Sequence, residues 1–201
     1  MNRSWQYKNL FAFLAGLLLV IRAGPGHADS FTGVNWLVHF NLPDQDYYEG
    51  PGEYVIRDAL LARINALQPG QTGVLATYTF SAAGTAGAIL SSISNALDRG
   101  ATVKFIVDYT IDVKASYDGL ALTTLTARSV NPLILSRATN SSGIMHHKFG
   151  LFDYGPTNRW LLAGSWNFSS KASYGQWNIA LEMKNAEAFS AYSKEAEELL
   201  A

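Results

Sequence analysis

Two short motifs in the C-terminal half of the chain carry side chains suited to phosphate chemistry. The first, MHHKFGLFD at residues 145–153, contains the pattern His-x-Lys-x4-Asp. The second, GSWN at residues 164–167, begins eleven residues after Asp153. A histidine can attack phosphorus, and a lysine ammonium can hold the non-bridging oxygens as charge develops on them. Ser165 and Asn167 offer a hydroxyl and an amide to the same oxygens. Together the motifs predict a phosphoryl-transfer site.

Alternation along a strand predicts which of these side chains work together. Side chains of a β-strand point to opposite faces in turn, so His146 and Lys148 share one face. His147 then shares the other face with Phe149 and Leu151, which are expected to be core residues. His147 is therefore expected to point away from the site.

A His-x-Lys pair alone is usually only part of a solvated strand face. The Gly-Ser-x-Asn motif that follows closely makes the functional interpretation the stronger one. The segment from 143 to 182 resembles the phospholipase D superfamily, whose signature is His-x-Lys-x4-Asp followed by Gly-Ser-x-Asn. Upstream, residues 76–80, 96–104 and 107–108 resemble the second strand, a helix and the third strand of that fold. The resemblance covers nearly all of the chain from about Val34 onward.

The resemblance implies a role for each motif residue. His146 matches the family's nucleophile, which forms a phosphohistidine intermediate, and Lys148 and Asn167 match its phosphate-binding pair. Ser165 would assist that pair. Asp153 matches the aspartate of the catalytic motif, but it lies on the other strand face from Lys148, so a structural role is expected for it. No cofactor is implied, and no metal site is expected.

The sequence departs from the family pattern where the family often has Asn-x-Glu, with a glutamate that orients the histidine. Here Asn178-Ile179-Ala180 places alanine at that position. Glu182 follows on the same strand face and is the candidate replacement for orienting His146. The ten residues between Asp153 and Gly164 also form a longer spacer than usual, with an extended turn at 155–158.

The two-step mechanism needs a second histidine, to protonate the leaving oxygen and then activate water. The chain has four histidines. His27 lies in a predicted signal peptide, His147 is expected to face away, and His39 is isolated and expected at an edge or facing a loop. A symmetric homodimer that brings two copies of His146 together is the simplest solution, and single-motif family members are built this way.

Alternating patterns predict one α/β domain over residues 29–201, with a mixed, mostly parallel sheet flanked by helices. Strands are expected at 34–40, 73–80, 102–107, 144–152, 159–164 and 177–183. Helices are expected at 54–67, 85–99 and 186–200, with a weaker one within 120–127 and a loop through 171–176. The composition, with 48% hydrophobic and 15% charged residues, excludes wholesale disorder, and the absence of cysteine excludes disulfides.

The first 28 residues have the pattern of a secretory signal peptide. A basic start precedes the twelve apolar residues 10–21, and small residues at Gly26 and Ala28 favour cleavage after Ala28. A twelve-residue helix is about 18 Å long, too short to cross a membrane. The mature protein is expected to be secreted or periplasmic. Removal of Arg3, Lys8 and Arg22 from the 15 basic side chains leaves 12 against 16 acidic ones, a formal charge of −4.

Three functions fit these observations: an endonuclease on DNA or RNA, a phospholipase D acting on lipid headgroups, and a non-catalytic binding module motivated by Ala180. Size and secretion resemble the small endonucleases of the family, so nucleic acid is the preferred substrate. A net acidic chain, however, binds nucleic acid poorly unless it has a local basic pocket. The scattered basic candidates for such a pocket are Arg99, Lys104, Lys114, Arg128, Arg137, Arg159 and Lys171. Beyond the homodimer no stable protein partner is expected.

Overall fold

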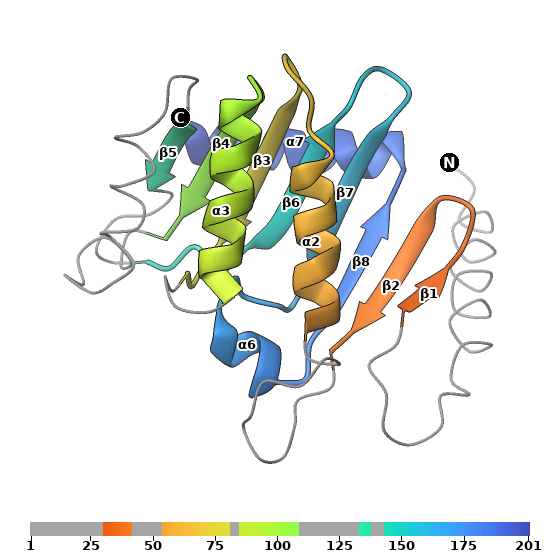
Figure 1. Ribbon diagram of the computed structural model, residues 1–201, viewed down its shortest axis with the longest axis vertical. Coiled ribbons are helices and arrows are strands. Elements are labelled where there is room, and N and C mark those ends of the chain that lie inside the picture. Colours follow the sequence, from red (N-terminus) through yellow and green to blue (C-terminus); the bar gives the residue numbers. More distant parts are fainter. Residues whose placement is uncertain (1–29, 42–53, 81–84, 109–132, 138–142) are drawn as a thin grey trace, which may run out of the picture.

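The computed structural model describes residues 30–41, 54–80, 85–108, 133–137 and 143–201 (Figure 1). The predicted signal peptide and the helix expected within 120–127 lie outside these residues. No helix among the described residues is long and apolar enough to cross a membrane.

The described residues form one eight-stranded sheet with helices on both faces. The sheet order is β1-β2-β8-β7-β6-β3-β4-β5. The strands are β1 (Ser30–Thr32), β2 (Trp36–Phe40), β3 (Thr72–Thr77), β4 (Thr102–Val107), β5 (Leu133–Arg137), β6 (Lys148–Asp153), β7 (Arg159–Gly164) and β8 (Ile179–Met183). The helices are α2 (Val55–Asn65), α3 (Thr85–Asp98), α6 (Ser170–Tyr174) and α7 (Ala186–Leu200).

The sheet is mixed, as predicted, but it is mostly antiparallel rather than mostly parallel. Only β4 pairs in parallel, with β3 and with β5; all other neighbouring strands are antiparallel. Helix α3 provides the crossover that parallel pairing of β3 with β4 requires. In the C-terminal part of the chain, β6 and β7 are joined by a tight turn at Gly155, whose φ is +132°, and the short helix α6 lies in the connection from β7 to β8. Short connections such as this turn join antiparallel strands. The prediction of a mostly parallel sheet was wrong because it extended the strand–helix alternation of the first half of the chain to these later strands.

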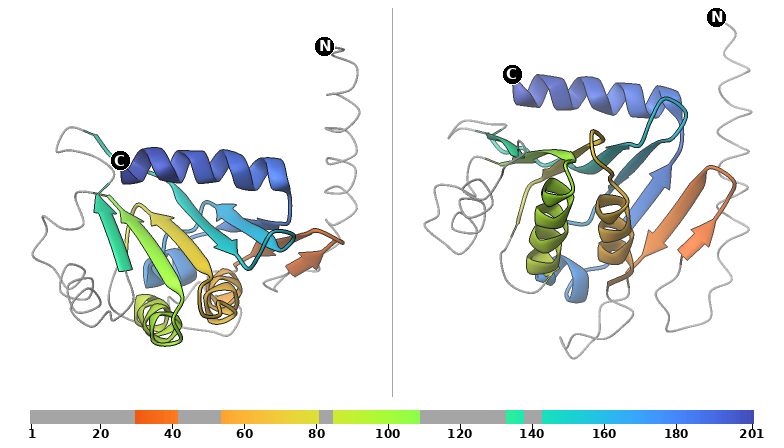
Figure 2. Two further views of the ribbon diagram at one scale, coloured as in Figure 1. Left: turned by 90° about the horizontal axis from the view of Figure 1, so that it is seen from above. Right: turned by 45° about the horizontal axis from the view of Figure 1, so that its top comes forward.

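Each face of the sheet is covered by its own apolar layer (Figure 2). Helices α2 and α3 cover one face; Ile56, Leu60 and Ile64 recur at four-residue intervals on α2 and are at most 1% exposed. Helix α7 covers the other face, where Phe149, Leu151 and Leu161 are buried. Burial of one such side chain is worth about 1.5–3 kcal/mol, so the two layers hold the sheet as a rigid platform.

Both motifs come to the same edge of this platform. Thr77 at the end of β3 pairs with Lys148 at the start of β6, and Gly164 at the end of β7 pairs with Ala180 near the start of β8. We call this end of the strands, where β3 and β7 finish and β6 and β8 begin, the site edge; α6 lies beside it (Figure 1). Asp153 pairs with Arg159 at the opposite edge.

Several element boundaries differ from the prediction. The strand expected from residue 144 begins at Lys148, so both adjacent histidines precede it. The segment 171–176, expected as a loop, includes most of the short helix α6, in which the Ser169 side chain accepts a hydrogen bond from the Ala172 N–H. Strands β1 and β5 were not predicted, because each is short and lies at an outer edge of the sheet.

Candidate active site

The residues that follow β3 bring the two motifs together. The ring of Tyr78 lies 4.8 Å from the imidazole of His146, measured between centroids, and 5.7 Å from the Lys148 Nζ. The next residue, Thr79, donates its backbone N–H to the Asn167 Oδ1 at 3.3 Å. The nucleophile candidate and the two candidate phosphate ligands therefore surround a single dipeptide.

The side chain of Lys148 is held close to His146 by a hydrogen bond to the backbone of that residue. Its Nζ donates to the carbonyl oxygen of His146 at 2.7 Å, which leaves two of its three protons for another acceptor. The side chain is largely buried, at 9% residue exposure, and this burial lowers the pKa of Lys148 below 10.5. A partly desolvated ammonium interacts more strongly with a phosphate than a fully hydrated one.

His146 and His147 have different surroundings, although both precede β6. His147 Nε2 lies 3.1 Å from the Glu195 carboxylate on α7, and its ring packs edge-on against Phe149. His146 is exposed, and among the described residues its ring nitrogens accept and donate no hydrogen bond. His146 is thus available to a substrate, whereas His147 contacts the α7 side of the sheet.

Asn167 and Ser165 differ in their freedom to bind phosphate. Asn167 uses its oxygen on Thr79, and within the described residues its amide NH2 group has no partner, so two donors face the site. The single hydroxyl proton of Ser165 goes to Asn178 Oδ1 at 2.9 Å, and its oxygen accepts the Ile179 N–H at 3.1 Å. Ser165 is therefore engaged with the start of β8.

Asp153 lies at the far end of β6, five residues from Lys148. At about 3.3 Å per residue, this is roughly 16 Å along the strand. Its carboxylate accepts from the Gly155 N–H at 3.0 Å and from Arg159 Nε at 3.1 Å. Within one chain Asp153 therefore lies away from the site edge and contacts the β6–β7 turn.

Glu182 does not orient His146 in this structure, so that hypothesis is wrong for a single chain. Glu182 pairs with Leu162, which pairs with Gly150, four residues along β6 from His146 and two strands away. Its carboxylate accepts instead from Arg63 Nε and lies 2.7 Å from His39 Nε2.

The environment of Glu182 keeps it ionised. Desolvation by burial raises its pKa, but the hydrogen bond with His39 and the charge and hydrogen bond of Arg63 outweigh burial and lower the pKa overall. His39 is 5% exposed and contacts Ser30 through Nδ1 at 2.7 Å. The expectation that His39 faces an edge or a loop was wrong, because the unpredicted strand β1 pairs on the outer side of β2.

Two contributors to the site carry little signal in the sequence. Tyr78 lies near the end of the strand expected at 73–80, and nothing in that segment shows that it meets a motif about seventy residues later. Asn178, 8% exposed, lies in the Asn-x-Ala segment that departs from the family pattern, and that departure was the only signal.

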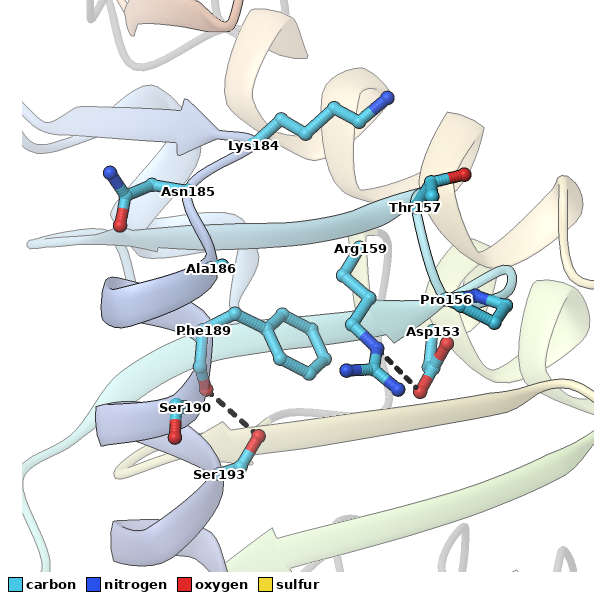
Figure 3. Close-up of a pocket in the computed structure, with 10 residues that line it drawn as sticks. All are labelled: Asp153, Pro156, Thr157, Arg159, Lys184, Asn185, Ala186, Phe189, Ser190 and Ser193. Atoms are coloured by element: carbon cyan, nitrogen blue, oxygen red, sulfur yellow. Dashed lines mark hydrogen bonds and ion pairs between the residues drawn. The ribbon is translucent and has the colours of Figure 1, made fainter.

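Two of the basic candidates for a nucleic-acid pocket, Arg99 and Arg159, lie away from the site edge. Arg99 binds backbone carbonyl oxygens at the end of α2, including that of Leu67 at 3.1 Å. Arg159 lines a pocket of about 490 Å³ at the opposite edge, between the β6–β7 turn and the start of α7 (Figure 3). There its guanidinium faces Asp153. This pocket is separate from the site edge.

No group of three or more potential metal ligands occurs among the residues that the structure describes. The groups assembled at the site edge are a nucleophile, a cation and amide donors. This arrangement can hold a phosphate diester and attack its phosphorus.

Comparisons with known proteins agree with this chemistry. Residues 60–200 match the family described as "Cardiolipin synthase, PLD-like domain". No curated protein matches the sequence.

Three solved structures illustrate the shared fold. Nuc from Salmonella typhimurium, described as a phospholipase D family member, has a TM-score of 0.60 at 20% identity, over 81% of this chain and 93% of Nuc. NucT from Helicobacter pylori has a TM-score of 0.60 at 17% identity, over 82% of this chain and 96% of NucT. Phosphatidylserine synthase from Haemophilus influenzae has a TM-score of 0.57 at 11% identity, over 71% of this chain and 34% of the synthase.

The family match spans more than half of the chain and contains both motifs, together with the strands that bring them to one edge. The protein therefore belongs to the phospholipase D superfamily, as a PLD-like phosphodiesterase whose residues 60–200 contain one copy of each motif.

Proposed function

We propose that this protein is a secreted or periplasmic endonuclease that hydrolyses phosphodiester bonds of DNA or RNA through a phosphohistidine intermediate. The observation that carries the proposal is the grouping of His146, Lys148 and Asn167 around Tyr78 and Thr79. The pattern of residues 1–28 supports export of the chain.

In the first step a neutral imidazole nitrogen of His146 attacks phosphorus. A P–N bond forms, the bond to the leaving oxygen breaks, and a second histidine donates a proton to that oxygen. Lys148 and the Asn167 amide hold the non-bridging oxygens. In the second step the second histidine removes a proton from water, the water oxygen attacks phosphorus, and His146 leaves.

The second histidine is proposed to be His146 of a second copy of the chain. Of the other histidines in the described residues, His39 is buried against Glu182 and His147 is engaged with Glu195. In one chain both imidazoles are therefore engaged away from the His146 ring. A twofold axis at the site edge brings two nucleophile candidates together.

Exposed apolar side chains at the site edge support such a contact. Among the described residues, four large hydrophobic side chains are exposed, and three of them flank the motifs: Ile144 at 59%, Trp177 at 74% and Ile179 at 41%. Apolar surface concentrated at one edge is typical of an interaction site. Contact with a second copy would cover it.

The coverage of the solved structures supports the nuclease over the phospholipase. The chain matches 93% of Nuc and 96% of NucT but only 34% of the phosphatidylserine synthase, so the shared fold makes up nearly all of the first two proteins and a smaller part of the synthase. The exposed side chains of Ile144, Trp177 and Ile179, here called the apolar rim, are the observation that favours the alternative function, a phospholipase, because a lipid-facing enzyme needs an apolar contact surface.

Two assays test the proposal. Hydrolysis of bis-p-nitrophenyl phosphate in EDTA detects either enzyme, and its absence would favour the non-catalytic binding module. Plasmid nicking is then compared with headgroup release from phospholipid vesicles, both in EDTA. We expect nicking without headgroup release; the reverse result would establish the phospholipase. Activity that is lost in EDTA and restored by Mg²⁺ would contradict the covalent-histidine mechanism.

A further inference from the structure

Two buried asparagines outside the motifs lie next to the Gly-Ser-x-Asn segment. Asn41, directly after β2, is 1% exposed. Its Oδ1 accepts the backbone N–H of Asn178 at 2.6 Å. Its Nδ2 lies within hydrogen-bond distance of three backbone carbonyl oxygens, those of Ala172 at 3.0 Å, Ser173 at 2.6 Å and Gln176 at 2.8 Å. One side chain thus holds α6, the turn that follows it and the approach to β8.

Asn178 passes this constraint to the motif. Its Nδ2 donates to the same Ala172 carbonyl oxygen at 2.7 Å, and its Oδ1 accepts the Ser165 hydroxyl at 2.9 Å. The backbone N–H of Ser165 donates to the Ile179 carbonyl oxygen at 3.0 Å. Ser165 is therefore fixed through its side chain to Asn178, which Asn41 binds, and through its backbone to the next residue, Ile179.

Ser165 is only two residues from Asn167, the candidate phosphate ligand. The residue between them, Trp166, is 2% exposed and donates its indole N–H to the Ser173 Oγ at 3.1 Å. Ser173 is itself one of the residues whose carbonyl oxygen Asn41 binds. Two series of contacts thus connect Asn41 with the backbone that carries Asn167. One runs through Asn178 and Ser165, and the other runs through Ser173 and Trp166.

We infer that Asn41 is a positioning residue of the active site, which sets the place of the Asn167 amide through the Asn178–Ser165 hydrogen bond and the α6 turn. The inference rests on the proposed function of that site. Asn41 lies outside the residues that match the family, so neither motif points to it. Its removal takes the side-chain acceptor away from the Asn178 N–H and one donor group away from the carbonyl oxygens that it binds, although the Ala172 oxygen keeps the Asn178 amide. The turn is therefore expected to shift toward new partners.

The test compares Asn41→Ala with Asn185→Ala. Asn185 is the N-cap of α7 and accepts the Ala188 N–H at 2.8 Å, so its loss also removes a side-chain hydrogen bond, but away from the site edge. Both variants are assayed with bis-p-nitrophenyl phosphate well below their Tm. We expect Asn41→Ala to lower kcat at least tenfold with KM changed less than about threefold, because small misplacement of a group that acts in the transition state is costly. Asn185→Ala should keep kcat within twofold at a comparable loss of Tm.

Coupling to Ser165 separates positioning from general stability. The double variant Asn41→Ala/Ser165→Ala should lose no more kcat than Asn41→Ala alone, since both changes break one chain of contacts. Multiplied losses, or a folded Asn41→Ala with wild-type kcat, would overturn the inference. If Asn41→Ala does not fold, Asn41→Ser retains one acceptor and one donor, and it should show an intermediate kcat.

A second readout does not depend on turnover. The side-chain amide resonances of Asn167 should shift in Asn41→Ala and stay in place in Asn185→Ala. Wild-type protein that fails to hydrolyse the diester would contradict the proposed function, while the resonances still report whether Asn41 positions Asn167. Unchanged Asn167 resonances in folded Asn41→Ala would overturn the inference in either case.

Discussion

His146 and His147 are adjacent in the chain, yet only one of them is free to act on a substrate. His146 is exposed next to Tyr78, whereas His147 pairs with Glu195 on α7. We expect His146→Ala to abolish hydrolysis of bis-p-nitrophenyl phosphate and His147→Ala to retain most of it. Circular dichroism confirms folding of both variants. Equal losses in two folded variants would contradict the assignment of the nucleophile.

Lys148 should give the reaction an alkaline limit. A lysine loses its charge as the pH rises through its pKa, and burial lowers the pKa of Lys148 below 10.5. The rate should therefore fall on the alkaline side at a pH below that value. Arginine stays protonated throughout this range, so Lys148→Arg should have a lower kcat/KM but no alkaline fall. Profiles of kcat/KM against pH for the two proteins check this, and parallel alkaline limbs would assign the titration to another group.

The residues of the site were predictable to the extent that they belong to a local pattern. His146 and Lys148 lie two positions apart, so strand alternation alone pairs them. The contact of Tyr78 with His146 and the pairing of Glu182 with His39 join residues far apart in the chain. Such contacts depend on strand order and register, and strand alternation within one segment contains no information about either. This is why Glu182 was assigned to His146 although its register places it beside His39 and Arg63.

At the level of the elements, Gly164 determines how closely β7 approaches β8 at the site edge. A Cβ at this position would lie 2.1 Å from the Ile179 carbonyl oxygen and 2.8 Å from the Ala180 Cα, both of them backbone atoms. Gly164→Ala should therefore separate the strands, lower the free energy of unfolding by about 1–3 kcal/mol and displace Ser165. Urea unfolding and diester hydrolysis both measure this. The matched control is Gly143→Ala, because a Cβ there meets no atom of the described residues within 4 Å; equal effects of the two changes would refute the argument.

The contacts of Glu182 join β8 to β2 and α2 and should make stability depend on pH. The folded-state pKa of Glu182 is lowered, so its stabilisation is fully present above the unfolded value of 4.5 and is lost as the pH falls through the folded value. Glu182→Gln should lower the free energy of unfolding at pH 7 by up to about 3 kcal/mol, since the Arg63 side chain is 20% exposed and water screens part of the pairing.

Urea unfolding from pH 7 to pH 3 checks this prediction. The difference between wild type and Glu182→Gln should shrink below pH 4.5, where the wild-type carboxylate becomes protonated. Glu195→Gln is the control, because Glu195 is 40% exposed in its contact with His147 and should change stability little. A difference that stays constant with pH would show that charge on Glu182 does not stabilise the fold.

Sequence patterns predicted the long elements and missed the short ones for a physical reason. Helix α7 and strand β4 have a clear apolar periodicity and agree with their predicted spans. Strand β1 has only three residues, too few for a pattern, and the five residues of β5 lie in a weakly patterned stretch of the chain; their pairing with β2 and β4 defines the two strands. The orientation of β6 relative to β3 was equally hidden, because it follows from chain connection rather than composition.

For the whole molecule, the formal charge of −4 expected after loss of the signal peptide opposes binding of a polyanion. Lys148 supplies a positive charge at the site edge, and a second copy across a twofold axis would double it there. The same symmetry would supply the second histidine and cover the apolar rim formed by Ile144, Trp177 and Ile179. Assembly is therefore the property on which the proposed chemistry depends most.

The dependence on assembly has a quantitative consequence for mixed subunits. A heterodimer of wild type with His146→Ala has one nucleophile and no histidine to protonate the leaving oxygen, so it should be largely inactive. After equal amounts exchange at random, about a quarter of the dimers are wild type, and activity should fall toward roughly a quarter at constant total chain concentration. Dilution below the dimer dissociation constant should likewise reduce activity per chain. Sedimentation and a differently tagged variant establish assembly and exchange. An active monomer, or a fall in activity only to half after proven exchange, would mean that a histidine within the chain serves as the acid. The buried His39 or the Glu195-bound His147 would then have to move to reach the site.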